Sequence, residues 1–288
     1  MINSDSSIYI PGEEWLYYKI YCGFHTSDVI IADIINPIAS HLINENLIDK
    51  WFFVRYYDTD YHLRIRLHLN STNFYTKVFS IVNHYLKPMM INGLVSSILI
   101  DTYERETKRY GNDNMDLAET IFFHDSVCTA TATSTFLGND NQYRRALFSF
   151  CSIDAFLDNF CLRDKDKSSF VSYMSKSFYE EIGMNHHLSV QLNKKYREYK
   201  PILDKILYQK DYQDDVWRNA LQKRATDIVL STSHIIKGAR NSEDVLKQYL
   251  WSYLHMLNNR IFRSQQRTNE LVVYYYMAKH YNSLLHRS

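Results

Sequence analysis

The chain has 288 residues, of which 45% are hydrophobic and 23% are charged, so it can bury a core of one large domain or two small ones. Its 33 Lys and Arg residues nearly balance 32 Asp and Glu residues. The resulting formal charge of +1 excludes bulk electrostatic binding of nucleic acid or of an anionic membrane. Any basic binding site must therefore be a local cluster of side chains.

The N-terminus and the cysteines favour a cytoplasmic protein. Residues 1–14 lack a positively charged segment followed by an apolar run, so they do not form a signal peptide, and we expect them to be flexible. No apolar stretch is long enough to span a membrane. The cysteines form no CxxC pair and have no histidines at ligand spacing, so we expect free thiols and no metal site. They are Cys22, Cys128, Cys151 and Cys161.

The first part of the chain mixes strand and helix patterns. Strands are predicted where apolar and polar residues alternate, and helices where apolar residues recur at helical spacing. The predicted elements are a strand over 15–24, a helix over 29–48, strands over 50–58 and 61–69, a helix over 73–90 and a strand over 94–103. Their order, β-α-β-β-α-β, is typical of a split βαβ or ferredoxin-like sandwich, in which the first and third strands are central.

We therefore predict the α+β fold class, with an N-terminal ferredoxin-like βαββαβ sheet unit over residues 15–111. Beyond Gly111 the pattern becomes helical, and an all-helical lobe is expected over 112–288. Because no low-complexity linker separates the two parts, residues 15–288 are interpreted as a single domain. Breaks between helices are expected at Gly138, Gly183 and Gly238.

The third predicted strand, Tyr61–Leu69, has an apolar face and a basic face, because successive strand side chains point to opposite sides. The basic positions are His62, Arg64, Arg66 and His68. A buried guanidinium without an anion is costly, whereas each charge-assisted hydrogen bond to a carboxylate returns about 1.5–3 kcal/mol. Arg64 and Arg66 therefore favour a shared anion, which is a protein carboxylate, a substrate carboxylate or a phosphate. The alternative is a solvated basic face without a site.

Four further residues are candidates for chemistry. Arg55, on the preceding strand, shares a face with Trp51, Phe53 and Tyr57. Arg105 and Arg109 are four residues apart and would lie on one side of a helix, although a loop of surface ion pairs is the alternative. His255 lies off the apolar stripe of its predicted helix, where an imidazole can move protons near neutral pH or serve a structural role.

Three segments together resemble the C-terminal domain of lantibiotic dehydratases, also described as the thiopeptide-type bacteriocin biosynthesis domain. They are KWFFVRYYDTDYHLRIRLHL, DTYERETKRYGN followed by MDLAETIFFHDS, and YLHMLNNRIF. The resemblance runs from about Trp15 to the C-terminus. It implies that glutamate, first transferred from glutamyl-tRNA to Ser or Thr of a precursor peptide, is eliminated by this domain to leave dehydroalanine or dehydrobutyrine.

The resemblance also implies roles for individual residues. Family elimination sites use arginines of the strand motif, an arginine of the YERE-like motif and a histidine, which here are Arg64, Arg66, Arg105 and His255. We expect the catalytic residues to be Arg66, Arg105 and His255, and the substrate-binding residues to be Arg64, Arg55 and Arg109. Arginines would hold the glutamyl carboxylates and stabilise an enolate-like oxygen, while the histidine exchanges a proton. No metal or organic cofactor is implied.

The chain departs from the family pattern because it contains no glutamylation domain. We expect a stand-alone half of a split dehydratase, which acts on the glutamylated precursor peptide together with a separate, glutamyl-tRNA-dependent glutamylation subunit. A homodimer is possible, and no direct contact with nucleic acid is expected. Two alternatives stay open: a pyridine-forming [4+2] cyclase of thiopeptide biosynthesis, and a non-catalytic domain that docks the precursor peptide.

Overall fold

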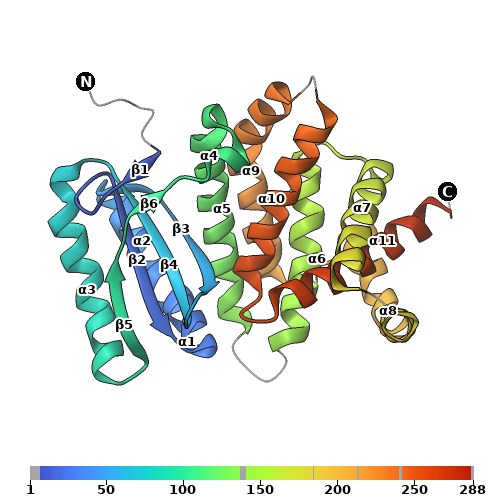
Figure 1. Cartoon of the computed structure of the whole chain (residues 1–288), viewed down its shortest axis with the longest axis horizontal. Helices are drawn as coiled ribbons and strands as arrows, with labels where there is room; N and C mark the ends of the chain where they lie inside the picture. Colours follow the sequence, from blue (N-terminus) through green and yellow to red (C-terminus); the bar gives the residue numbers. More distant parts are fainter. Residues whose placement is uncertain (1–6, 137–140, 184, 213, 240–241, 287–288) are drawn as a thin grey trace. The chain divides into compact units, whose positions relative to one another are not determined.

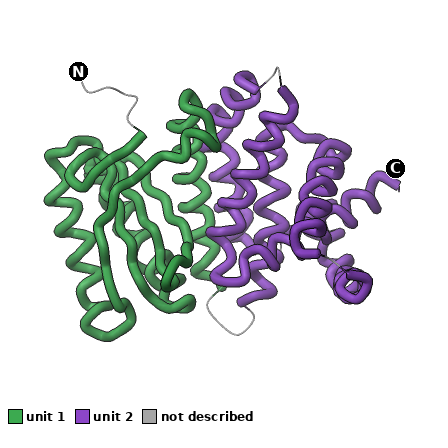
Figure 2. Tube along the Cα trace, in the orientation of Figure 1, with its two compact units in different colours: residues 1–137 green, residues 138–288 purple. Residues whose placement is uncertain are grey.

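The computed structural model divides into two compact units, Met1–Leu137 and Gly138–Ser288, which we describe separately (Figure 2). The structure describes residues 7–136, 141–183, 185–212, 214–239 and 242–286. The first unit combines an antiparallel sheet with helices, and the described residues of the second form helices. The predicted α+β fold class is therefore confirmed.

A four-stranded antiparallel sheet forms the centre of unit 1 (Figure 1). Its strands are β2 (Trp15–Cys22), β3 (Ile48–Tyr57), β4 (Tyr61–Leu69) and β5 (Val95–Ile100). They lie in the order β3-β4-β2-β5, so the first and third strands of this sheet are central. The register places Arg66 of β4 between Tyr17 of β2 and Phe52 of β3. Residues paired in this way share one face, so aromatic rings flank this arginine on both sides.

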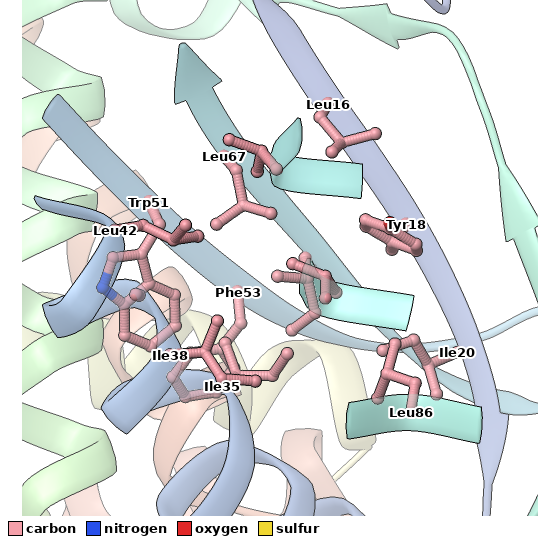
Figure 3. Close-up of a cluster of buried hydrophobic side chains, with 14 of the residues drawn as sticks. Leu16, Tyr18, Ile20, Ile35, Ile38, Leu42, Trp51, Phe53, Leu67 and Leu86 are labelled. Atoms are coloured by element: carbon pink, nitrogen blue, oxygen red, sulfur yellow. The ribbon is translucent and has the colours of Figure 1, made fainter. Parts of the chain in front are cut away.

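Helices pack on the opposite face of the sheet. They are α1 (Phe24–Val29), a π-helical segment (Ile30–Ile35), α2 (Asn36–Asn44) and α3 (Tyr75–Ile91). Alternate strand side chains, such as Leu16 and Leu67, meet helix side chains such as Ile38 and Leu86 in the core (Figure 3). Burial of each contributes about 1.5–3 kcal/mol. This fixes the faces of the strands, because a shift by one residue would turn every apolar side chain outward.

Helix α5 (Met115–Thr133) also belongs to unit 1. Its Ser126 Oγ accepts a hydrogen bond of 3.2 Å from the main-chain nitrogen of Phe53 in β3, and its Ala130 joins the core. The helical pattern expected from residue 112 thus begins inside this unit, because α5 covers β3, an edge strand of the sheet. Shorter elements are α4 (Thr107–Tyr110) and the 3-10 segments Thr72–Phe74, Asn112–Asn114 and Ser134–Phe136.

The N-terminal segment, for which the sequence predicts flexibility, forms part of a second, two-stranded sheet. It consists of β1 (Ile8–Tyr9) and β6 (Tyr103–Glu104). The rings of Tyr9 and Tyr103 stack with centroids 6.2 Å apart, and the main-chain nitrogen of Arg105 donates to the carbonyl of Ser7. These contacts order residues 7–9, whereas residues 1–6 lie outside the described part of the chain.

Unit 2 is helical throughout its described residues. Its elements are α6 (Asn141–Asn159), α7 (Asp164–Ile182), α8 (His186–Leu203), a π-helical segment (Asp204–Tyr208), α9 (Asp215–Gly238), α10 (Glu243–Ile261) and α11 (Gln266–Leu285). Helix α11 packs along α7, and α6 contacts α9, α10 and α11. Gly183, in the left-handed conformation with φ of 69°, ends α7, and Gly238 is the last residue of α9, as predicted. The break predicted at Gly138 lies outside the described residues. Among the described helices, none is both long enough and apolar enough to cross a membrane.

Candidate active site

A pocket of about 620 Å³ lies on the basic face of the sheet in unit 1. Its cationic side chains are Lys19, Arg64, Arg66, Arg105, Lys108 and Arg109, and its acidic side chains are Asp101, Glu104 and Glu106. The pocket is thus locally basic although the whole chain is nearly neutral. It brings together four of the six predicted site residues, namely Arg64, Arg66, Arg105 and Arg109.

Arg66 is surrounded by aromatic rings and pairs with no carboxylate in the described part of the chain. Its guanidinium carbon lies 4.3 Å from the ring centroid of Tyr17, 4.7 Å from that of Tyr103 and 5.2 Å from that of Phe52. Its Nε is buried and finds no hydrogen-bond acceptor among the described residues. A buried donor without an acceptor costs about 1–3 kcal/mol, so this geometry favours an external anion as the acceptor.

Arg64 lies against an aromatic ring and donates a hydrogen bond to a histidine. Its guanidinium carbon is 3.4 Å from the ring centroid of Tyr56. Its Nε donates to Nε2 of His62 over 3.2 Å, and Nδ1 of His62 donates to the carbonyl of Asp60 over 3.1 Å. The terminal amino groups of Arg64 have no acceptor within the described residues, so they are available to a ligand in the pocket.

Arg105, in contrast, is bound by carboxylates of the protein itself. Two hydrogen bonds of 2.8 and 2.7 Å join it to Glu119, and a third of 2.8 Å joins it to Asp116. The Tyr103 hydroxyl donates to the same Glu119 carboxylate over 2.8 Å. Burial opposes the positive charge, but the hydrogen bonds and attraction from Glu119 outweigh it and raise the pKa of Arg105. Its bidentate donors are therefore already occupied.

Two other cations of the pocket each pair with one carboxylate. Arg109 is 47% exposed and pairs with Glu106 over 3.0 Å, three residues earlier in the chain. Lys19 of β2 pairs with Asp101, which follows the end of β5. Exposed pairs of the Arg109 type contribute at most about 1 kcal/mol, so an incoming anion can replace the carboxylate at little cost.

Arg55 lies on the other face of the sheet, away from the pocket residues of β4. It stands opposite Leu63 in the register, and its side chain is buried. Its guanidinium donates to Asp28 over 2.8 Å and to Ser27 over 2.6 Å. The structure thus separates Arg55 from the other predicted substrate ligands, because the strand alternation turns it toward the helices and a buried carboxylate balances its charge.

His255 belongs to unit 2, where it lies on α10 with 29% of its side chain exposed. Its Nδ1 is 3.1 and 3.2 Å from the two carboxylate oxygens of Glu270, which is buried in α11. The Tyr274 hydroxyl donates to Glu270 over 3.4 Å, and Arg267 approaches the carboxylate to 3.5 Å. A carboxylate on Nδ1 orients the imidazole and leaves Nε2 as the nitrogen that can exchange a proton.

Glu270 is a residue that the sequence reasoning missed. It follows His255 by 15 positions and lies in a different helix, so no local spacing joins the two. The available signal was a single acidic side chain beside the apolar run Leu271–Tyr276 of α11. The described residues include no group of three or more His, Cys, Asp and Glu side chains arranged to hold a metal ion.

Comparison with protein families identifies the class to which this α+β chain belongs. The model described as "Lantibiotic biosynthesis dehydratase C-term" matches residues 15–281. The chain therefore belongs to the lantibiotic dehydratase C-terminal family, as the resemblance predicted.

Two curated relatives span the same region. The subtilin biosynthesis protein SpaB of Bacillus subtilis is 23% identical over 272 residues, which cover 92% of this chain and 25% of SpaB. The nisin biosynthesis protein NisB of Lactococcus lactis subsp. lactis is 22% identical over 275 residues, which cover 94% of this chain and 26% of NisB. The chain thus spans about a quarter of the length of these relatives.

Solved structures share the fold. The tRNA-dependent lantibiotic dehydratase MibB from Microbispora sp. 107891 superposes with a TM-score of 0.75 at 20% identity, over 96% of this chain and 29% of MibB. TsrL superposes with a TM-score of 0.66 at 11% identity, over 95% of each chain. The pyridine synthase TbtD from thiomuracin biosynthesis has a TM-score of 0.61 at 11% identity, over 96% of this chain and all of TbtD. At these identities the likeness is one of fold.

Proposed function

We propose that this chain eliminates glutamate from glutamylated Ser or Thr residues of a ribosomal precursor peptide, giving dehydroalanine or dehydrobutyrine in lantibiotic-type biosynthesis. The observation that carries the proposal is Arg66, whose guanidinium is held by aromatic rings in the basic pocket and pairs with no carboxylate of the described residues. Cation–π contacts can hold such a charge in place while its donors remain ready for an anion. Membership of the dehydratase family makes the glutamyl carboxylate the natural candidate for that anion.

The chemistry requires removal of a Cα proton and loss of a carboxylate. The electrons of the Cα–H bond form the Cα=Cβ double bond while the Cβ–O bond breaks, and glutamate leaves with that oxygen. Arg64 would bind the carboxylate, and Arg66 would also stabilise the enolate-like oxygen as charge develops. His255, oriented by Glu270, would exchange the proton through Nε2.

We assign different roles to the two arginines of the YERE-like segment. Arg109 is half-exposed and loosely paired, so we propose it as a substrate ligand. Arg105 supports the pocket wall, because Glu119 and Asp116 already occupy its donors. The order of strands and helices in unit 1 supports a ferredoxin-like scaffold beneath this pocket.

We further propose that glutamate is attached outside these 288 residues by a glutamyl-tRNA-dependent dehydratase component in the cytoplasm. The family resemblance implies that full-length dehydratases perform both steps, and the chain spans about a quarter of its curated relatives. The glutamylated precursor peptide would then be the shared substrate. Size-exclusion chromatography with light scattering tests whether the protein is a homodimer.

The test is mass spectrometry of a glutamylated precursor peptide incubated with the purified protein. Each elimination should remove the mass of glutamic acid, and Arg66→Ala and His255→Ala should accumulate the glutamylated peptide. Arg163→Ala is the control, because Arg163 is an exposed arginine paired with Asp166 at the start of α7. Glutamylated peptide left intact by the folded wild type, with and without its partner, would contradict the proposal. Activity restricted to a peptide with two dehydroalanines would instead indicate a pyridine-forming cyclase.

A further inference from the structure

His62 is fully buried on the pocket face of β4, beside the arginine pair. Its ring lies between those of Tyr21 on β2 and Tyr56 on β3, with centroid distances of 4.6 and 5.5 Å. Its side chain has no exposed surface and does not line the pocket. It cannot touch a ligand there, so any effect on the site must pass through a neighbour.

The hydrogen bonds of His62 define one form of its imidazole. The Asp60 carbonyl can only accept, so Nδ1 carries the proton. Nε of Arg64 can only donate, so Nε2 of His62 must offer its lone pair. Only the neutral imidazole protonated on Nδ1 satisfies both partners.

The surroundings of His62 favour this neutral form. Burial lowers its pKa, while the hydrogen bond to Asp60 and the Asp58 carboxylate, 3.8 Å from Nδ1, work in the opposite direction. Arg64 on the same strand and Lys19 on β2 lower the pKa further. Tyr21 and Tyr56 enclose the ring, so solvent does not reach it.

The neutral His62 restricts the side chain of Arg64. Because Nε2 of His62 accepts the hydrogen bond of Arg64 Nε and the Tyr56 ring lies against the guanidinium, the side chain is held in one orientation before a ligand arrives. The two terminal amino groups are then the donors that a ligand in the pocket can use. Holding a flexible arginine in its binding orientation lowers the entropic cost of binding an anion.

We infer that His62 is a positioning residue that presents the terminal amino groups of Arg64 to a carboxylate of the substrate. This inference rests on the proposed function, because it takes the pocket to be the site of the glutamyl group. The inference gives His62 a role that His68 does not share. His68 lies on the same face of β4, but it is hydrogen-bonded to Asp49 over 2.6 Å and does not line the pocket.

Steady-state kinetics of elimination test this role with matched variants. His62→Phe keeps an aromatic ring but removes the acceptor, so KM should rise by about tenfold, the effect of one lost hydrogen bond, with kcat nearly unchanged. His62→Gln supplies an amide oxygen as acceptor and should restore most of the loss. In an Arg64→Lys background His62→Phe should have no further effect, because lysine has no Nε proton to donate. His68→Phe is the control and should leave KM unchanged.

A second measurement does not depend on turnover. Nuclear magnetic resonance of the protein with 15N-labelled histidine should show His62 protonated on Nδ1 at neutral pH, and Arg64→Lys should shift its Nε2 signal. A His62 protonated on Nε2, or equal KM values for His62→Phe and wild type, would overturn the inference. A wild type that shows this signal but leaves the glutamylated peptide intact would instead contradict the proposed function.

Discussion

At the scale of single residues, Arg105 and Arg109 line the same pocket but differ in what holds them. Arg105 satisfies the buried Glu119, whereas Arg109 pairs at the surface with Glu106. Arg105→Ala leaves the Glu119 carboxylate buried without its cation, and we expect a loss of about 3–5 kcal/mol in the free energy of unfolding. Arg109→Ala should change stability by less than about 0.5 kcal/mol while raising KM for the glutamylated peptide. Urea denaturation of both variants checks this, and equal destabilisation would contradict the division of roles.

His62 gives a prediction for the pH dependence of stability. Its pKa is lowered in the fold, so between that value and the unfolded value of about 6.5 the unfolded chain binds the extra proton. The contribution to stability is complete above the unfolded pKa and is lost as the pH falls through the folded pKa. His62→Gln should therefore lose less Tm than wild type between pH 7.5 and pH 5.5. The two proteins should run parallel between pH 7.5 and pH 8.5, where His62 is neutral in both states.

At the scale of elements, the sequence predicted the alternating faces of β4. The contacts that its side chains make depended on the neighbouring strands and helices. The two-residue period correctly placed Arg64 and Arg66 on the face opposite Ile65. The same rule, applied across the hairpin, would have put Arg55 opposite Leu63 on the apolar face, but this requires the register of the turn. Glu270 could not be found in this way, because its pairing with His255 arises from the packing of two helices rather than from spacing along one.

The edge of β3 provides a test of how α5 is joined to the sheet. Ser126 of α5 accepts a hydrogen bond from the main-chain nitrogen of Phe53, so Ser126→Ala removes this contact between α5 and β3. We expect a destabilisation of about 0.5–1.5 kcal/mol, the net contribution of one hydrogen bond, measured by urea denaturation. Ser134→Ala is the matched control, because the exposed Ser134 hydroxyl bonds within its own turn to Thr131. An equal loss in both variants would indicate that helix propensity, and not the contact with β3, is responsible.

At the scale of the whole molecule, each unit buries ion pairs as well as apolar side chains. Unit 1 buries the Arg55–Asp28 pair beside the apolar core under its sheet, and unit 2 buries an ion-pair cluster centred on Asp154 of α6. This carboxylate pairs with Lys167 over 2.7 Å and also with Lys210, and it accepts a hydrogen bond from Tyr281. Burial alone would raise the pKa of Asp154, but the two lysines outweigh it and lower the pKa. The cluster thus contributes its full stabilisation at pH values above the ordinary carboxyl pKa. This stabilisation is lost as the pH falls through the lowered pKa of Asp154.

Asp154→Asn should accordingly destabilise unit 2 more than the substitution of an exposed charged residue does. It keeps the size of the side chain but removes the buried carboxylate that Lys167 and Lys210 share, leaving Lys167 with the half-exposed Asp158. We expect a loss of about 1–3 kcal/mol. Hydrogen exchange measures this locally, since amides of α6 and α7 should lose protection. Glu180→Gln is the control, because the Lys176–Glu180 pair is exposed and should contribute less than about 1 kcal/mol. Protection in α6 that survives Asp154→Asn would mean that the apolar packing of unit 2 suffices and that the buried ion pairs add little, as can happen when desolvation cancels attraction.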